Sequence, residues 1–174
     1  GAEAIGALAH YIAVVSAAGG VVLASGYGLA VLLARVPPGR FARAMLPVQA
    51  VALSTQSSLA CLPAMLAAAR RLGLREPTAD FALPLAVAVF RATSPAMNMA
   101  VAIYAAHLSG VALSPAALVA GVLVAFLVSL SSVSLPGTIS FVVSVGPIAM
   151  AMGVPVAPLA LLVAVEMLPD IMRT

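Results

Sequence analysis

The clearest candidates for chemistry in this sequence are Asp170, Arg173 and Thr174. Their spacing of three and four positions puts the three side chains on one face of a predicted helix. Ionisable groups inside an apolar segment usually face an interior cavity and mark the path of a substrate. Because a guanidinium binds a carboxylate through two hydrogen bonds and an aspartate suits an ammonium group, the set suits an acidic amino acid. The simpler alternative is that Arg173 reaches toward the membrane interface and Asp170 pairs with it.

Two serine-containing motifs are the next candidates, because each interrupts an apolar stretch. The first begins at Ser57 and Ser58, and the second ends in Leu135, Pro136 and Gly137. A broken helix is tolerated in hydrocarbon only where its backbone is buried in protein or lines a wet cavity. Interrupted segments at corresponding places in two halves of a chain point to the binding site of a secondary transporter. We expect hydroxyl and N–H groups of both motifs to bind the substrate's α-carboxylate, although a serine in a membrane helix often bonds only its own backbone.

The composition of the chain predicts a membrane around these groups. Hydrophobic residues make up 64% of the 174 residues and charged residues 7%, whereas soluble domains have about 25% charged residues. The mean hydropathy is +1.21. Residues 92–165 contain no Asp, Glu, Lys or Arg, and one spanning helix takes about 20 apolar residues, so this run holds several membrane elements. The sequence predicts a multi-pass protein of the inner cell membrane, in contact with the lipid bilayer.

The arginines predict how the chain enters the membrane. Six of the eight basic residues lie in two clusters, at positions 35–43 and 70–75, which indicates cytoplasmic loops near anionic headgroups. The clusters are too sparse for nucleic-acid binding. The apolar segment between them, 44–72, is therefore predicted to enter and leave on the same side as a re-entrant hairpin. The linkers around residues 116–151 have no arginine or lysine, so a second hairpin is predicted to enter from the opposite face.

The expected fold is all-α, with inverted repeats of a re-entrant helical hairpin followed by a broken transmembrane helix. The alternation that is typical of barrel strands is absent from the sequence. One helix is broken near Ser94 and Pro95, which makes Ser94 a further candidate for substrate binding. In order, the predicted elements are a transmembrane helix at 4–34, a hairpin at 44–72, a broken transmembrane helix at 78–107, a second hairpin at 116–151, and the start of a substrate helix at 157–174.

Four motifs in this order resemble those of the dicarboxylate/amino acid:cation symporter family, which includes the glutamate transporters. Residues 56–63 (QSSLACLP) look like the serine-rich first hairpin tip of the family, and residues 81–85 (FALPL) look like the opening of its next helix. Residues 135–137 (LPG) are similar to the Val-Pro-Gly of the second tip, and residues 166–174 (EMLPDIMRT) are similar to the substrate helix. The resemblance covers nearly the whole chain, and it implies symport by elevator-type movement of a transport domain.

The resemblance also implies roles and partners. In the family, the arginine and the aspartate that Arg173 and Asp170 resemble bind the side-chain carboxylate and the amino group of the substrate. The chain looks like part of the mobile transport domain, so we expect a fragment without the scaffold helices through which the family forms homotrimers. The sequence has no recognisable signal peptide. No cofactor is implied beyond a coupling ion, for which Na⁺ and H⁺ both stay open.

The most unusual residue under this resemblance is Arg91. Residues 90–94 (FRATS) align with the Asn-Met-Asp-Gly-Thr sodium signature of the family, so phenylalanine and alanine replace the asparagine and aspartate that bind sodium. Neither replacement supplies a side-chain oxygen for a hard cation. We therefore hypothesise that the guanidinium of Arg91 substitutes for part of the sodium requirement, with Glu166 or Asp170 as its counter-charge. The alternative is an arginine that braces the helix break in a water-filled pocket.

One sodium site is expected to persist. In the family it is built largely from backbone carbonyls around the second tip, here near Ser129, Leu130 and Ser132. The two histidines, His10 and His107, are weaker candidates, because a packed or interfacial histidine is commoner in such surroundings than a ligand or a proton relay.

The sequence thus favours a secondary active transporter of an acidic amino acid with altered or reduced sodium dependence. Three alternatives stay open: a C4-dicarboxylate carrier, a degenerate relative or channel that does not transport, and an intramembrane serine–histidine enzyme. Asp170 argues for an amino group on the substrate. An enzyme is disfavoured, because neither histidine lies near a serine motif and no Gly-x-Ser-x-Gly motif is present.

Overall fold

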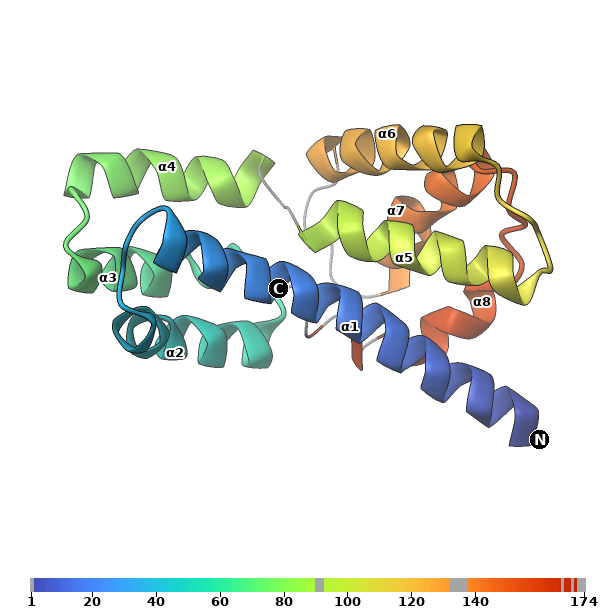
Figure 1. Ribbon diagram of the computed structural model, residues 1–174, viewed down its shortest axis with the longest axis horizontal. Coiled ribbons are helices and arrows are strands. Elements are labelled where there is room, and N and C mark those ends of the chain that lie inside the picture. The colour runs from blue at the N-terminus through green and yellow to red at the C-terminus, as the bar shows by residue number, and fades with distance from the viewer. Residues whose placement is uncertain (1, 90–92, 132–137, 167, 170, 172–174) are drawn as a thin grey trace.

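The computed structural model describes residues 2–89, 93–131, 138–166, 168, 169 and 171, and every regular element in these ranges is a helix. The helices form two groups, with α2, α3 and α4 in one and α5 to α8 in the other, and α1 runs alongside both (Figure 1). The elements are α1 (Ala2–Leu32), α2 (Pro38–Thr55), α3 (Leu62–Leu72), α4 (Glu76–Val89), α5 (Thr93–Leu108), α6 (Pro115–Ser131), α7 (Thr138–Ala151), α8 (Leu159–Leu162) and the 3-10 helix η1 (Val163–Val165).

Two helical segments are long and apolar enough to cross a membrane. The segment Ile5–Leu32 of α1 has 28 residues, which corresponds to about 42 Å of helix against a hydrocarbon core of about 30 Å. Its mean hydropathy is 1.9. The second segment, Glu76–Leu108, contains α4 and α5 and passes through residues 90–92, which lie outside the described ranges. Thr93 begins α5, so Ser94 and Pro95 lie in its first turn.

The helices α2 and α3, called here the first helix pair, have local signals at their ends. Pro38 lies in the first turn of α2, where its missing N–H costs no hydrogen bond. For this reason α2 begins at Pro38, whereas the sequence places the start of this segment at residue 44. The residue that follows α2, Gln56, adopts the left-handed conformation (φ 48°), and so does Gly73 (φ 83°), which follows α3. A glycine has no Cβ to oppose that conformation, so Gly73 is a favourable residue for ending α3.

The two members of the first helix pair run antiparallel. The guanidinium of Arg40, in the first turn of α2, donates hydrogen bonds of 3.3 Å to the carbonyls of Arg71 and Leu72 at the end of α3. These carbonyls belong to the last turn of the helix, which has no N–H partners of its own. Between the helices lies a small core that includes the buried residues Val48 and Cys61. The start of α2 and the end of α3 therefore lie side by side.

The helix α5 is the centre of the second group. It packs against α1, α6 and α7, and its buried residues cover a broad face of the helix, whereas Ile103 and His107 are exposed. Alanines at 102, 105 and 106 allow these neighbours to approach closely. We call α6 and α7 the second helix pair, since they pack on each other as well as on α5. The chain then turns into α8, which begins at Leu159, whereas the sequence predicts that this helix begins at residue 157.

The outward faces of several helices are strongly apolar. On α6, Leu123, Phe126 and Leu127 are 60%, 57% and 65% exposed, and on α4 Phe81 is 72% exposed. A soluble monomer rarely presents apolar surface of this kind over whole helix faces. These faces suit contact with hydrocarbon or with other membrane helices.

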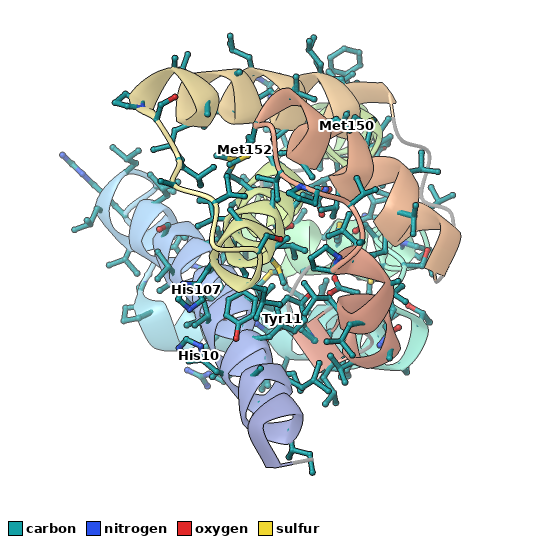
Figure 2. All side chains as sticks on the ribbon, turned by 90° about the vertical axis from the view of Figure 1, so that its right-hand side faces the viewer. His10, Tyr11, His107, Met150 and Met152 are labelled. Carbon is teal, nitrogen blue, oxygen red and sulfur yellow. The ribbon has the colours of Figure 1, made fainter. Side chains whose placement is uncertain are left out.

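In the second group, Gly121 lies so close to two methionine side chains that a larger side chain would fit only if they moved. A Cβ atom on Gly121 of α6 would lie 2.5 Å from the sulfur of Met152 and 3.0 Å from the methyl carbon of Met99. Met152 is buried beneath α6, whereas Met150 is 65% exposed (Figure 2). Gly121 therefore lets the chain after α7 pack directly against α6.

We expect the substitution Gly121→Ala to lower the free energy of unfolding by about 1 kcal/mol, because the methionines must move to admit the methyl group. The matched control is Gly146→Ala on α7, where an added Cβ meets nothing within 4 Å. That change should stabilise the helix by about 0.5–1 kcal/mol. Thermal unfolding of the detergent-solubilised full-length protein measures both, and equal melting temperatures would contradict the close packing at Gly121.

Candidate functional site

The interrupted ends of the helices point toward the middle of the molecule. In Figure 1 the last turns of α2, α4 and α6 and the first turns of α3 and α5 face the region between the two groups. The packing of α4 against α3 and α6, and of α5 against α6 and α7, agrees with this arrangement. Helix ends carry backbone groups without helical partners and the partial charges of the helix dipole. The middle of the molecule is therefore the region best suited to hold a polar ligand.

The first serine motif forms the turn between α2 and α3, where Ser57 and Ser58 are both partly buried. The hydroxyl of Ser57 accepts a hydrogen bond from the N–H of Ala60 at 3.3 Å, and the carbonyl of Ser57 accepts one from the N–H of Cys61 at 3.2 Å. The N–H of Ser57 is held by the hydroxyl of Thr55 at 3.4 Å. The motif thus bonds its own backbone, as the simpler interpretation expects. Because the Ser57 hydroxyl acts as acceptor there, its hydrogen remains available for donation.

Ser94 is buried in the first turn of α5, next to a residue that the sequence did not single out. Asn98, one helical turn further on, is 1% exposed, and its Nδ2 donates to the hydroxyl of Ser94 at 3.4 Å. In the part of the chain that the structure describes, the Oδ1 atom of Asn98 is buried and accepts no hydrogen bond. A buried acceptor without a donor costs about 1–3 kcal/mol. Asn98 therefore offers an oxygen to a donor or a cation, and its spacing of four from Ser94 was the available signal.

The expected sodium-binding segment lies at the end of α6. Ser129 is 4% exposed, and its hydroxyl donates to the carbonyl of Phe126 at 2.9 Å, whereas the side chain of Leu130 is 55% exposed. Ser129 and Leu130 lie in the last turn of α6, and the carbonyls of a last helical turn are available to partners outside the helix. Carbonyls at a helix C-terminus carry partial negative charge, which suits a cation. The sodium site itself stays a prediction.

Most of the remaining predicted residues lie outside the described ranges. This applies to the residue proposed as a tethered cation and to the larger part of the predicted substrate set, so their arrangement stays a prediction. The residues concerned are Arg91, Ser132, Leu135, Pro136, Gly137, Asp170, Arg173 and Thr174.

Glu166, one of the two counter-charges proposed for Arg91, lies in the described part of the chain and is buried. Glu166 is 6% exposed at the end of η1, and its carboxylate accepts a hydrogen bond from the hydroxyl of Tyr11, which is 0% exposed on α1. The ring of Tyr11 packs against that of Tyr104 on α5, with ring centroids 5.3 Å apart. The sequence assigned no role to Tyr11, because 155 positions separate it from Glu166.

The two histidines belong to the same aromatic group. Figure 2 shows His10, Tyr11 and His107 near the contact of α1 with α5. The hydroxyl of Tyr104 donates to the carbonyl of Ala7 at 2.7 Å and lies 3.1 Å from Nδ1 of His10. Since a phenol has one hydrogen to give, Nδ1 of His10 is the donor in the second contact. His10 and His107 are both exposed. The hydrogen bond of His10 thus goes to a tyrosine, not to a serine that it could activate.

Comparison with known proteins identifies one family. The family described as the sodium:dicarboxylate symporter family matches residues 1–174, which is the whole chain. No curated protein matches it.

We expect Asn98→Leu to leave the free energy of unfolding within about 1 kcal/mol of the wild type, because it removes a buried acceptor that lacks a described donor and also removes the hydrogen bond from Nδ2 to Ser94. The same substitution should lower substrate uptake by about tenfold or more, because the ligand loses a hydrogen-bond or coordination partner. The measurements are thermal unfolding and uptake of labelled aspartate or succinate by the full-length protein.

The control for Asn98→Leu is Ser109→Ala, just beyond the opposite end of α5, where the Ser109 hydroxyl donates to the carbonyl of Ala105 at 2.8 Å. It should leave uptake unchanged. Normal uptake by Asn98→Leu would exclude Asn98 from the site.

Proposed function

Because the chain belongs to the sodium:dicarboxylate symporter family, we propose that it carries an acidic amino acid across the membrane together with a cation. Members of this family are helical membrane transporters of dicarboxylates or amino acids and are not enzymes. The observation that carries the narrower proposal is the group of buried hydroxyl, amide and carboxyl side chains within an otherwise apolar helical interior. Polar groups of this kind inside a membrane protein usually mark the path of a substrate or ion.

We propose that both helix pairs are re-entrant. The segment 44–72 would enter from the cytoplasm and the segment 116–151 from the opposite face, each followed by a membrane helix, at 78–107 and 157–174. The hydrogen bonds from Arg40 to the carbonyls of Arg71 and Leu72 support the first half, because they bring both arginine clusters to one end of the pair. Two basic clusters at one place fit a single cytoplasmic interface.

The proposed substrate set combines groups from both pairs and from the last helix. Arg173 would bind the side-chain carboxylate of the substrate and Asp170 its ammonium group, with Thr174 on the same face. The two tips, together with Ser94, would offer hydroxyl and N–H groups to the α-carboxylate. The described members of the two tips are Ser57 and Ser58, and the others are Leu135, Pro136 and Gly137. A C4-dicarboxylate is the runner-up, since it would leave Asp170 without an ammonium partner.

We propose that the intact protein works as its family resemblance implies. The chain would form part of a transport domain that moves as an elevator within a homotrimer of the inner membrane. The apolar outward faces of α4 and α6 support a position among lipids or other membrane helices. Sodium dependence would be reduced, because residues 90–92 lack the oxygen side chains of the family signature, with a remaining site at Ser129, Leu130 and Ser132.

The substrate assignment is tested by uptake into proteoliposomes that contain the full-length protein. We expect labelled aspartate to be taken up in preference to succinate, and Asp170→Asn to reduce that preference. Arg173→Lys should raise the aspartate concentration for half-maximal uptake about ten- to a hundredfold, since lysine cannot bind a carboxylate through two parallel hydrogen bonds. The control is Arg75→Lys at an exposed position. A preference for succinate that Asp170→Asn leaves unchanged would favour the dicarboxylate carrier.

The role of Arg91 is tested by its neutral variant. Arg91→Met should make aspartate uptake more dependent on sodium, because the fixed cation is lost and a mobile one must replace it. Uptake is measured with and without a sodium gradient, and Arg75→Met serves as the charge-matched control. An unchanged response to sodium would instead assign Arg91 to bracing the helix break.

A further inference from the structure

An open hollow of about 410 Å³ lies at the end of the first helix pair where α2 begins and α3 ends. It is lined by Arg40, Arg43 and Ala44 of α2 and by Arg71 of α3. Three of these four residues are arginines, and neither the proposed substrate site nor the predicted sodium site uses them. Because like charges are gathered there in a concave surface, the hollow is suited to bind an anion.

Local hydrogen bonds orient two of the three guanidinium groups. Both bonds of Arg40 to the carbonyls at the end of α3 start from its Nη2 atom, so its Nε and Nη1 hydrogens are left for another acceptor. The Nε atom of Arg43 donates to the carbonyl of Gly39 at 3.1 Å, which leaves the hydrogens of both its Nη atoms. All three arginines are exposed, so an anion from outside can reach them.

The protein itself balances little of this positive charge. In the described ranges, the salt bridge of the arginine clusters joins Arg70 to Glu76 at 3.0 Å, and neither residue lines the hollow. The other carboxylate of the neighbouring helix α4 belongs to Asp80, which is exposed one turn beyond Glu76. The lining contains no carboxylate among the described residues. The counter-charge must therefore come from a bound anion or from the solvent.

The charges of the hollow suit a ligand with two phosphate groups. The end of α3 carries a partial negative charge, and Arg40 binds its carbonyls, which offsets part of the charge of that arginine. Arg43 and Arg71 then remain as two full charges at the hollow. Each guanidinium can bind one phosphate through two parallel hydrogen bonds. A ligand with a single phosphate would leave one of the two arginines without a partner.

Apolar residues follow these arginines closely in the chain, which favours a lipid over a free anion. Leu46, three positions after Arg43 and on the same face of α2, is 60% exposed, and Leu74, three positions after Arg71, is 55% exposed. In the re-entrant arrangement proposed above, this end of the pair lies at the cytoplasmic interface. Phosphate headgroups and the first carbons of the acyl chains meet there, and basic pockets on that side of membrane proteins bind polyanionic headgroups.

We propose that this hollow is a specific site for a phospholipid whose headgroup has two phosphate groups, as the headgroup of cardiolipin has. One phosphate binds Arg43 and the other binds Arg71, and the remaining hydrogens of Arg40 donate to the same headgroup. The inference rests on the proposed placement of the first helix pair, and it concerns a second ligand and not the transported substrate. It differs from a general attraction of basic loops to anionic membranes, because the lining arginines alone provide the site.

The experiment titrates the purified full-length protein in detergent with cardiolipin and counts bound lipid by native mass spectrometry. Phosphatidylglycerol, which has one phosphate, is titrated at the same phosphate concentration. We expect cardiolipin to bind about tenfold more tightly, because its second phosphate adds charge-assisted hydrogen bonds. Arg43→Gln and Arg71→Gln each remove the guanidinium of one phosphate, so each should weaken cardiolipin binding by about tenfold or more.

The matched control is Arg75→Gln, which removes the same charge from an exposed arginine that does not line the hollow. It should bind cardiolipin as the wild type does. Thermal unfolding provides a second readout. Because a ligand stabilises the folded state that binds it, cardiolipin should raise the melting temperature of the wild type and of Arg75→Gln more than that of Arg43→Gln.

Three results would overturn the inference. If Arg75→Gln weakened binding as much as Arg43→Gln does, the attraction would belong to the whole basic cluster. Equal binding of cardiolipin and phosphatidylglycerol would exclude a site for two phosphates. Complete displacement of cardiolipin by inorganic phosphate at the same phosphate concentration would assign the hollow to a free anion. These outcomes are independent of the proposed transport function, which fails only if the protein takes up neither aspartate nor succinate.

Discussion

The constraint that organises this molecule is that hydrocarbon leaves no backbone polar group without a partner. Continuous helices meet it automatically, and helix ends do not. Here the last turns of α2, α4 and α6 and the first turns of α3 and α5 face the region between the two groups (Figure 1). Arg40 satisfies carbonyls at one end of α3, and a left-handed residue closes each of α2 and α3. Backbone polar groups that would lack partners in hydrocarbon are thus gathered where a polar ligand can bind them.

The same constraint explains why so few of the buried side chains are polar. The described buried polar residues, Ser94, Asn98, Ser129, Ser144 and Glu166, are set among apolar neighbours. Local backbone or side-chain bonds hold Ser94 and Ser129, and Tyr11 holds Glu166. Asn98 has a fully buried acceptor atom that no donor reaches in the described part of the chain. The chain belongs to a family of symporters, and we propose that these groups bind a small polar substrate inside an apolar protein interior.

The sequence was most informative where polar residues interrupt apolar runs. The break at 56–61 separates α2 from α3 in the structure, because a left-handed residue ends α2 and a proline lies in the first turn of α3, whereas Ser94 and Pro95 lie in the first turn of α5. The family was also recognisable from four short motifs, and the match to the whole chain confirms it. The pairing of Tyr11 with Glu166 was not predictable, since no local pattern connects residues so distant in the chain. Asn98 was missed because the alignment drew attention to residues 90–94, one turn earlier.

The path of α1 has a mechanical consequence. This helix touches the first group through Tyr27, which contacts Phe41 and Gln49, and it touches the second group through Ala7 and Tyr11. A helix of this length resists bending and stretching far better than a loop does, so it acts as a strut between the two groups. A force applied to either group along the axis of α1 would therefore displace the other group by nearly the same distance. The two groups would then travel as one rigid body, and relative motion would be confined to the thin connections at the interrupted helix ends.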